Sequence, residues 1–392
     1  MRLVIALSLV VACKSKSSEP PAPTVTTNTI AVDSAASTTP AAPAPKLPGA
    51  LYFKRGEALE KLEGGAFVTD FADVGAPLFP SQFTLPDGRV VGIASKGDGE
   101  AGSEQLVLIG PGTKVERIGP AHTQVRNPAV DPGGTWIVIE SKVEPHSELY
   151  RIDLASQKPL QLTNNPQGNF SPAILDAKTV VFASSRDGDS EIYKLDLATK
   201  KPTRLTAFHR DDWSPRVSPD KKTIAFLSDR EGPPRIFLVN ADGTNLRRFT
   251  ASSDAGEEDD PMWSPEGKSI AFLRAGKLVV REVVAGAAVV GATGAGAAVV
   301  GAIGAAGGTE RVLTPDGARD AEPAWSPDGR YIAVSRTRPA TSTTPASVAD
   351  IWVIPLANSA DKGDGSIAAA SAVEPIAVTS GADARLPRWH AK

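Results

Sequence analysis

The segment EPAWSPDGRYIAV, residues 322–334, recurs as DPMWSPEGKSIAF at residues 260–272 and as SPRVSPDKKTIAF at residues 214–226. Each copy joins a proline, a turn of the Ser-Pro-Asp-Gly kind and an apolar run. Proline fixes φ and Asp bonds its own backbone, which predicts a tight turn. The run that follows is apolar at consecutive positions, which predicts a strand covered on both faces. One such unit cannot bury both of its faces alone.

The unit repeats along the chain at nearly constant spacing. Its first prolines are Pro128, Pro172, Pro215, Pro261 and Pro323, with successive spacings of 44, 43, 46 and 62 residues, and a degenerate copy starts at Gln82. Each complete copy carries four strand signals separated by turn residues. Four-stranded units of about 44 residues that cover one another's faces are typical of the blades of an all-β propeller.

A propeller of this kind has to close. Residues 50–80 contain three strand candidates but lack the first, innermost strand of a blade. The last fragment, Leu386–Trp389, matches a first strand but is not followed by the other three. Together they predict one composite blade. Six starts plus this composite favour seven blades over residues 49–392, whereas a poor strand signal in residues 50–79 would leave six.

Several motifs resemble those of TolB-type and related WD-repeat-like β-propellers. They are the repeated WSPDG turn, the Ser-Asp-Arg segment at residues 228–230, SSRDGDSEIYKLDL at residues 184–197 and NADG at residues 240–243. The resemblance covers about residues 50–392 and implies a propeller fold with a TolB-like role in protein binding. The separate amino-terminal α/β domain of TolB has no counterpart in this sequence.

The first residues read as an export signal. Arg2 precedes a ten-residue apolar run, which is too short to span a bilayer. The segment Val10–Cys13 resembles the bacterial lipobox, which implies cleavage after residue 12 and lipid attachment to Cys13; an ordinary signal peptide with a chance cysteine is the alternative. Lys14 follows where a retention signal would have Asp, so we expect the periplasmic side of the outer membrane.

Residues 13–48 are rich in Ser, Thr, Ala and Pro and predict a disordered tether. A second low-complexity stretch, residues 285–308, contains the tandem decamer GAAVVGATGA and GAAVVGAIGA. Its eight glycines between residues 286 and 308 disfavour a membrane-spanning helix. We expect an outer hairpin or loop there, with an interaction loop as the alternative.

Composition excludes some classes of function. The formal net charge of -3, from 42 basic and 45 acidic residues, disfavours a nucleic-acid partner. The single cysteine excludes an intramolecular disulfide. The four histidines, His122, His146, His209 and His390, have no metal-ligand spacing, and a G-x-S-x-G nucleophile motif is absent. We therefore expect no cofactor and no metal, and the sequence favours binding over catalysis.

Acidic residues precede the expected innermost strands of several blades, and the loops there should gather around one mouth of the central channel. These candidate binding residues are Asp211, Asp212, Asp259, Asp260, Asp320, Glu322 and Asp383. A negative ring would attract a basic peptide or a cation. Alternatively, the carboxylates bond backbone amides or pair with nearby arginines. The Ser-Asp-Arg ends, such as Asp229 and Arg230, are expected to form structural pairs between blades.

The leading hypothesis is a monomeric, lipid-anchored periplasmic propeller that binds an envelope protein or peptide, with the membrane contacted through the lipid alone. The alternative is an enzyme or a sensor of small ligands or sugars that uses the central channel. A purely structural envelope protein is the third possibility.

Overall fold

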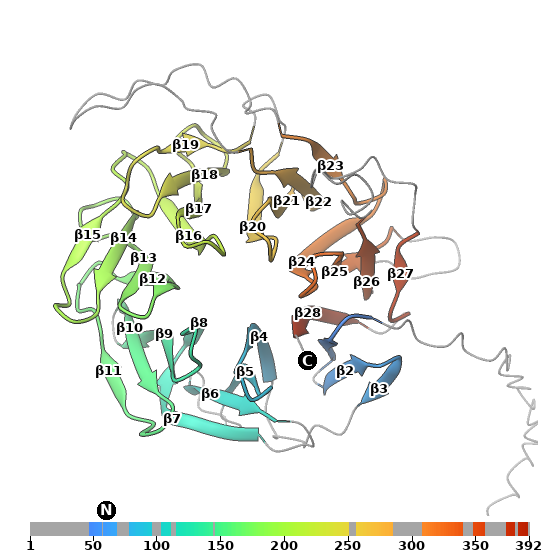
Figure 1. Cartoon of the computed structure of the whole chain (residues 1–392), viewed down its shortest axis with the longest axis horizontal. Coiled ribbons are helices and arrows are strands. Elements are labelled where there is room, and N and C mark those ends of the chain that lie inside the picture. The colour runs from blue at the N-terminus through green and yellow to red at the C-terminus, as the bar shows by residue number, and fades with distance from the viewer. Residues whose placement is uncertain are drawn as a thin grey trace, which may run out of the picture. The chain divides into compact units, whose positions relative to one another are not determined.

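Seven antiparallel sheets of four strands each form a ring in the computed structural model (Figure 1). The structure describes residues 47–56, 58–68, 78–95, 103–110, 115–143, 146–250, 256–284, 308–339, 348–356, 374–380 and 383–390. In these ranges every regular element is a strand, and none is a helix that could cross a membrane. The seven-bladed propeller is thus confirmed. The expected signal peptide, Cys13, the tether and nearly all of the insertion at 285–308 lie outside the described residues.

Each blade is named here by its innermost strand. The composite blade contains β28 (Ala384–His390), β1 (Ala50–Arg55), β2 (Ala58–Glu63) and β3 (Ala66–Val68). The next three blades contain β4 (Leu78–Thr84), β5 (Val90–Ser95), β6 (Ser103–Ile109) and β7 (Val115–Thr123); β8 (Val125–Val130), β9 (Trp136–Val143), β10 (His146–Asp153) and β11 (Pro159–Gln161); and β12 (Asn169–Asp176), β13 (Thr179–Ser184), β14 (Glu191–Asp196) and β15 (Pro202–Arg204).

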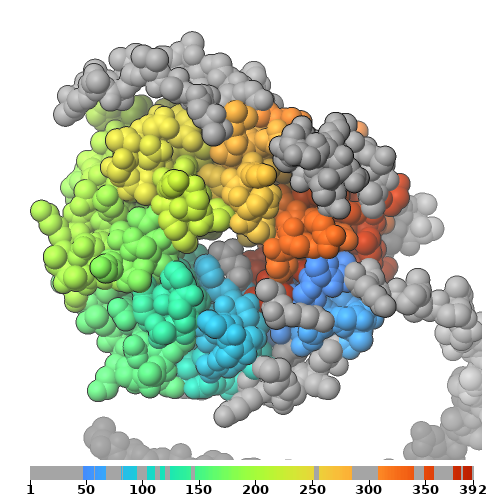
Figure 2. Space-filling view, viewed as in Figure 1, coloured from blue at the N-terminus to red at the C-terminus, as the bar shows by residue number. Residues whose placement is uncertain are grey.

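The remaining blades contain β16 (Asp212–Val217), β17 (Thr223–Ser228), β18 (Arg235–Asn240) and β19 (Arg247–Arg248); β20 (Glu258–Trp263), β21 (Ser269–Arg274), β22 (Lys277–Glu282) and β23 (Glu310–Val312); and β24 (Arg319–Trp325), β25 (Tyr331–Thr337), β26 (Ala349–Pro355) and β27 (Ile376–Ala377). The space-filling view shows an opening at the middle of the ring (Figure 2).

The ring closes as expected, because the carboxy-terminal strand β28 pairs with the first strand β1. Their antiparallel register joins Ala50 to His390 and Leu51 to Trp389. Trp389 also packs with residues of the neighbouring β24 blade in one apolar cluster. The two ends of the propeller therefore share a blade and its core.

The core lies between blades, not within them. Alternate side chains of β17 face opposite neighbours: Ile224 and Phe226 pack against the β12 blade, and Ala225 and Leu227 pack against the β20 blade. Each of the seven apolar clusters in the described residues joins two adjacent blades in this way. This explains why the second strand of each repeat is apolar at consecutive positions.

The repeated Trp-Ser-Pro-Asp segment performs two structural tasks. The Ser326 hydroxyl donates to Asp328 at 2.6 Å and accepts the backbone N–H of Tyr331 at 2.9 Å, which closes the turn. The indole N–H of Trp325 donates to the carbonyl of Met262 in the preceding blade at 3.2 Å. Trp263 repeats this bond to the carbonyl of Arg216 at 2.9 Å. The motif thus shapes each blade and also joins it to its neighbour.

The first proline of each repeat lies at a β-bulge in the innermost strand. The register shifts between Asp259 and Met262 in β20 and between Ala321 and Ala324 in β24. Proline has no N–H to donate, so a bulge accommodates it without the loss of a ladder bond. The residue before it takes a left-handed conformation, with φ of 49° at Asp260 and 57° at Glu322. This bulge lets the strand begin before its proline, so several of the acidic residues lie within the strand instead of ahead of it.

Arginines at the ends of the second strands form buried ion pairs inside their own blades. Arg230 pairs with Asp212 at 2.6 Å, and their side chains are 8% and 0% exposed. Arg336 pairs with Asp320 at 2.6 Å in the same way, with exposures of 3% and 0%. The expectation of pairs between blades at the Ser-Asp-Arg ends was therefore wrong for Arg230. The reason is the antiparallel register, which places the end of β17 beside the start of β16.

Removal of residues 386–392 should lower the melting temperature by about 5–10 °C, because most of β28 and the buried Trp389 would be lost. Differential scanning calorimetry of the truncated chain measures this. Removal of residues 391–392 alone is the control and should have no effect. Equal melting temperatures for all three chains would contradict closure by this strand.

Substitution of Asp212 by Asn should cost about 3–5 kcal/mol of unfolding free energy, because it leaves the guanidinium of Arg230 buried without a counter-charge. Asp383→Asn is the matched control. Its partner Arg385 and Asp383 itself are 58% and 57% exposed, so the loss should stay below about 0.5 kcal/mol. Urea unfolding measures both, and similar losses would argue against a structural role for the buried pair.

Acidification should destabilise the closing strand through His390. Both ring nitrogens of this buried side chain lack a hydrogen-bond partner among the described residues, and the ring packs edge-on against Tyr52 with 4.9 Å between ring centroids. Burial and the neighbouring Arg388 lower the pKa of His390 to about 3, from an ordinary value of 6.5. The unfolded chain therefore takes up this proton first as the pH falls.

The free energy of unfolding should accordingly fall between pH 6.5 and about pH 3, by at most about 1.4 kcal/mol per pH unit, and this contribution should level off below pH 3. Urea unfolding of the wild type and of His390→Phe across this range isolates the contribution. Parallel pH profiles for the two chains would show that His390 does not titrate as described.

Candidate functional site

The seven acidic residues expected at the channel mouth divide into two kinds. Asp212 and Asp320 are buried, and each forms an ion pair with an arginine of its own blade, so their carboxylates are not available to a ligand. Asp211 is exposed and accepts the backbone N–H of Ser190 at 2.7 Å. Asp383 is also exposed and pairs with Arg385, its neighbour two residues on, at 2.9 Å. These contacts match the alternative considered for the carboxylates, namely bonds to backbone amides and arginines.

The other three, Asp259, Asp260 and Glu322, lie on the innermost strands β20 and β24 (Figure 1). Asp260 and Glu322 occupy the same position of their repeats, directly before the bulge proline. A Glu322 carboxylate oxygen accepts the backbone N–H of Leu386 in the composite blade at 2.7 Å. Asp259 accepts the N–H of Asp260 at 2.8 Å and is exposed.

Two arginines that the sequence analysis missed complete this group. Arg216 on β16 and Arg388 on β28 each follow the bulge proline of their blade, where other copies have Ala129, Ala173 or Ala324. The guanidinium of Arg216 donates to the carbonyl of Pro215 at 3.2 Å, while its Nε has no partner in the part of the chain that the structure describes. Arg388 donates to the carbonyl of Pro387 at 2.8 Å. The signal that could have identified them was an arginine in two copies of a position that is alanine in three copies and Met262 in another.

Five side chains from four adjacent innermost strands thus form one group of charges, the channel cluster: Arg216, Asp259, Asp260, Glu322 and Arg388. Burial, followed by the charges of Asp259 and Glu322, raises the pKa of Asp260, and Arg216 and Arg388 oppose this rise. Burial lowers the pKa of both arginines, and the acidic members oppose that shift. The five side chains therefore lie near enough on adjacent innermost strands for their charges to influence one another.

The channel cluster presents both signs of charge. None of its members forms an ion pair within 4.0 Å with a described residue. The buried pairs Arg230–Asp212 and Arg336–Asp320 differ in this respect. The arrangement can therefore hold a ligand through charge-assisted hydrogen bonds of either polarity. Among the residues that the structure describes, no group of three or more His, Cys, Asp or Glu side chains could hold a metal ion.

Comparison with known proteins agrees with this architecture. Residues 166–287 match the family model of the TolB beta propeller domain. The uncharacterized peptidase YuxL of Bacillus subtilis is 28% identical over 153 residues, and the match spans 31% of this chain and only 21% of that protein.

Among solved structures, TolB from Acinetobacter baumannii is 18% identical, with coverage of 91% of this chain and 89% of that one and a TM-score of 0.52. An oligogalacturonate lyase in complex with manganese is 15% identical, with coverage of 80% and 84% and a TM-score of 0.52. Likenesses this distant establish the fold alone. The seven four-stranded blades show that the chain contains a β-propeller, and residues 166–287 of it match the TolB beta propeller domain.

Proposed function

We propose that this protein is a lipid-anchored periplasmic propeller of the cell envelope that binds a protein or peptide segment across the mouth of its central channel. The observation that supports this proposal is the channel cluster, whose charges are not neutralised by direct ion pairs. The buried charges of Arg230 and Arg336, in contrast, are neutralised by Asp212 and Asp320. A charged group that is partly dehydrated and unpaired gains most from a ligand that pairs with it.

The channel cluster also indicates which charges the ligand should carry. The charges of Asp259, Asp260 and Glu322 and those of Arg216 and Arg388 influence one another, so this group of charges is not uniformly negative. A segment that carries basic and acidic side chains in alternation would meet both signs. The proposed anchor at Cys13 and the tether to residue 48 would hold the propeller at the outer membrane while the mouth remains accessible.

The test is capture of envelope proteins by the full chain and by two matched variants. The channel variant carries Asp259→Asn, Asp260→Asn and Glu322→Gln, and the control carries Asp211→Asn and Asp383→Asn. We expect the channel variant to lose at least tenfold of the captured partner and the control to retain it, with capture by the wild type weakening as salt rises. Both variants should keep the wild-type melting temperature, because the buried pairs are untouched.

If the channel variant captures as much partner as the wild type, the binding surface does not include the channel cluster, and this part of the proposal is wrong. A melting-temperature rise with Ca²⁺, Mn²⁺ or sugars, abolished in the channel variant, would instead favour a small-ligand sensor or an enzyme.

A further inference from the structure

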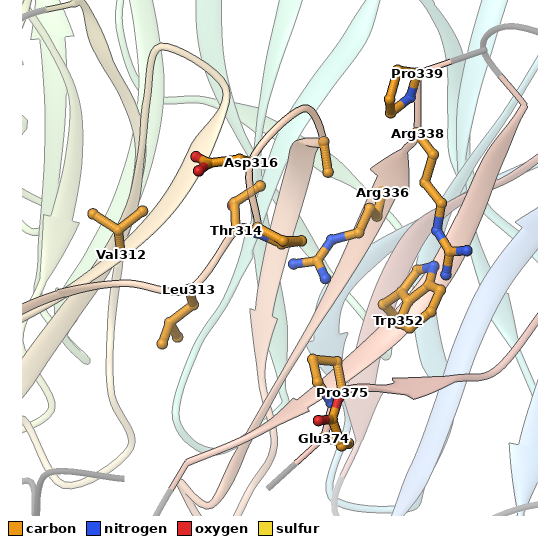
Figure 3. Close-up of a pocket in the computed structure, with 12 residues that line it drawn as sticks. Val312, Leu313, Thr314, Asp316, Arg336, Arg338, Pro339, Trp352, Glu374 and Pro375 are labelled. Atoms are coloured by element: carbon orange, nitrogen blue, oxygen red, sulfur yellow. The ribbon is translucent and has the colours of Figure 1, made fainter. Parts of the chain in front are cut away.

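A cavity of about 530 Å³ lies between the β20 and β24 blades, and none of the residues that line it belongs to the channel cluster (Figure 3). Its walls come from β23 and the connection to β24, from the end of β25, from β26, and from the segment before β27. Most of its lining is apolar and includes Val312, Leu313 and Pro315. The indole of Trp352 forms part of the wall.

Three polar side chains of this cavity, Thr314, Asp316 and Arg336, already have partners. Arg336 binds both carboxylate oxygens of Asp320, at 2.6 and 2.7 Å. Asp316 pairs with Lys277 at 3.1 Å. Three groups remain without a hydrogen bond or ion pair to any described residue, namely the Arg338 guanidinium, the Glu374 carboxylate and the Trp352 indole N–H, the last of which is buried.

Arg338 is an addition to the pattern of the other blades. In the β16 and β20 blades, one arginine, Arg230 or Arg274, both pairs with an acidic residue and covers an aromatic ring. Arg336 plays that part in the β24 blade, at 5.6 Å from the ring of Trp352. Arg338 stacks closer, at 4.1 Å, and the recurrent pair leaves no acidic partner for it. The repeat therefore does not account for this second cation.

The free charges lie on either side of an apolar surface. Figure 3 shows the indole of Trp352 between the guanidinium of Arg338 and the carboxylate of Glu374. A guanidinium suits a carboxylate and a carboxylate suits an ammonium group, and each bond would be charge-assisted. Charges separated by an indole suit a zwitterion with separated ends better than an α-amino acid, whose two charges are adjacent.

We propose that this cavity is a binding site for a short apolar peptide with free termini. The carboxylate terminus binds Arg338, the ammonium terminus binds Glu374, and the side chains pack on Trp352 and the surrounding aliphatic residues. The site is independent of the channel cluster and does not require the function proposed for it.

The probe is the dipeptide phenylalanyl-leucine, titrated into the full chain by isothermal calorimetry and followed by tryptophan fluorescence. We expect saturable binding that weakens at least tenfold when the dipeptide is amidated at its carboxyl end or acetylated at its amino end. Arg338→Gln should remove the effect of amidation, and Glu374→Gln should remove the effect of acetylation. Arg330→Gln, an exposed arginine in a turn of the same blade, is the control and should change neither.

Three results would overturn the proposal. They are no saturable binding of the dipeptide at millimolar concentration, equal affinity for free phenylalanine, and unchanged affinities in both variants that keep the wild-type melting temperature. A lower melting temperature of Arg338→Gln with unchanged dipeptide affinity would mean that Arg338 only covers Trp352.

Discussion

The structure depends on the fact that each sheet is apolar on both faces. Because Ile224 and Phe226 face one neighbour while Ala225 and Leu227 face the other, a blade is stable only between two others. A linear array would leave two apolar faces in water, so the chain must return to its start. The pairing of β28 with β1 meets this demand, and the central channel follows from it.

The repeat separates residues that hold the fold from residues that are free to vary. The alternating core side chains recur in every blade, the turn serine closes the turn in the β16, β20 and β24 blades, and the indole bond joins the β20 and β24 blades to the blades before them. The residue before the bulge proline is under weaker constraint, since its side chain contributes to none of the seven apolar clusters. Six blades carry five different residue types at this position while the left-handed backbone is retained: Asn127, Ser171, Ser214, Asp260, Glu322 and Leu386. This position can therefore give each blade a different group at the channel.

The fold could be predicted from sequence because the repeat is local: turn, strand period and spacing all lie within one copy. The candidate site was only partly predictable because it depends on register. Asp212 looked like a mouth residue, since its partner Arg230 is 18 positions away and is brought beside it only by the pairing of β16 with β17. Arg216 and Arg388 were missed because their proximity to Asp260 depends on how successive blades pack side by side, which lies outside any single repeat.

The contrast between the two arrangements of charge bears on function. Arg230 and Arg336 are buried, and each donates to both carboxylate oxygens of an aspartate, Asp212 or Asp320. Their charges are thus neutralised within the blade. Arg216 and Arg388 are half-buried, and their guanidiniums donate only to the carbonyls of adjacent prolines. Holding a cation in a partly dehydrated site without a directly bound counter-ion disfavours folding. Direct ion pairs among the described residues therefore do not account for these two arginines, and the proposed function does, through a ligand that brings carboxylates to them.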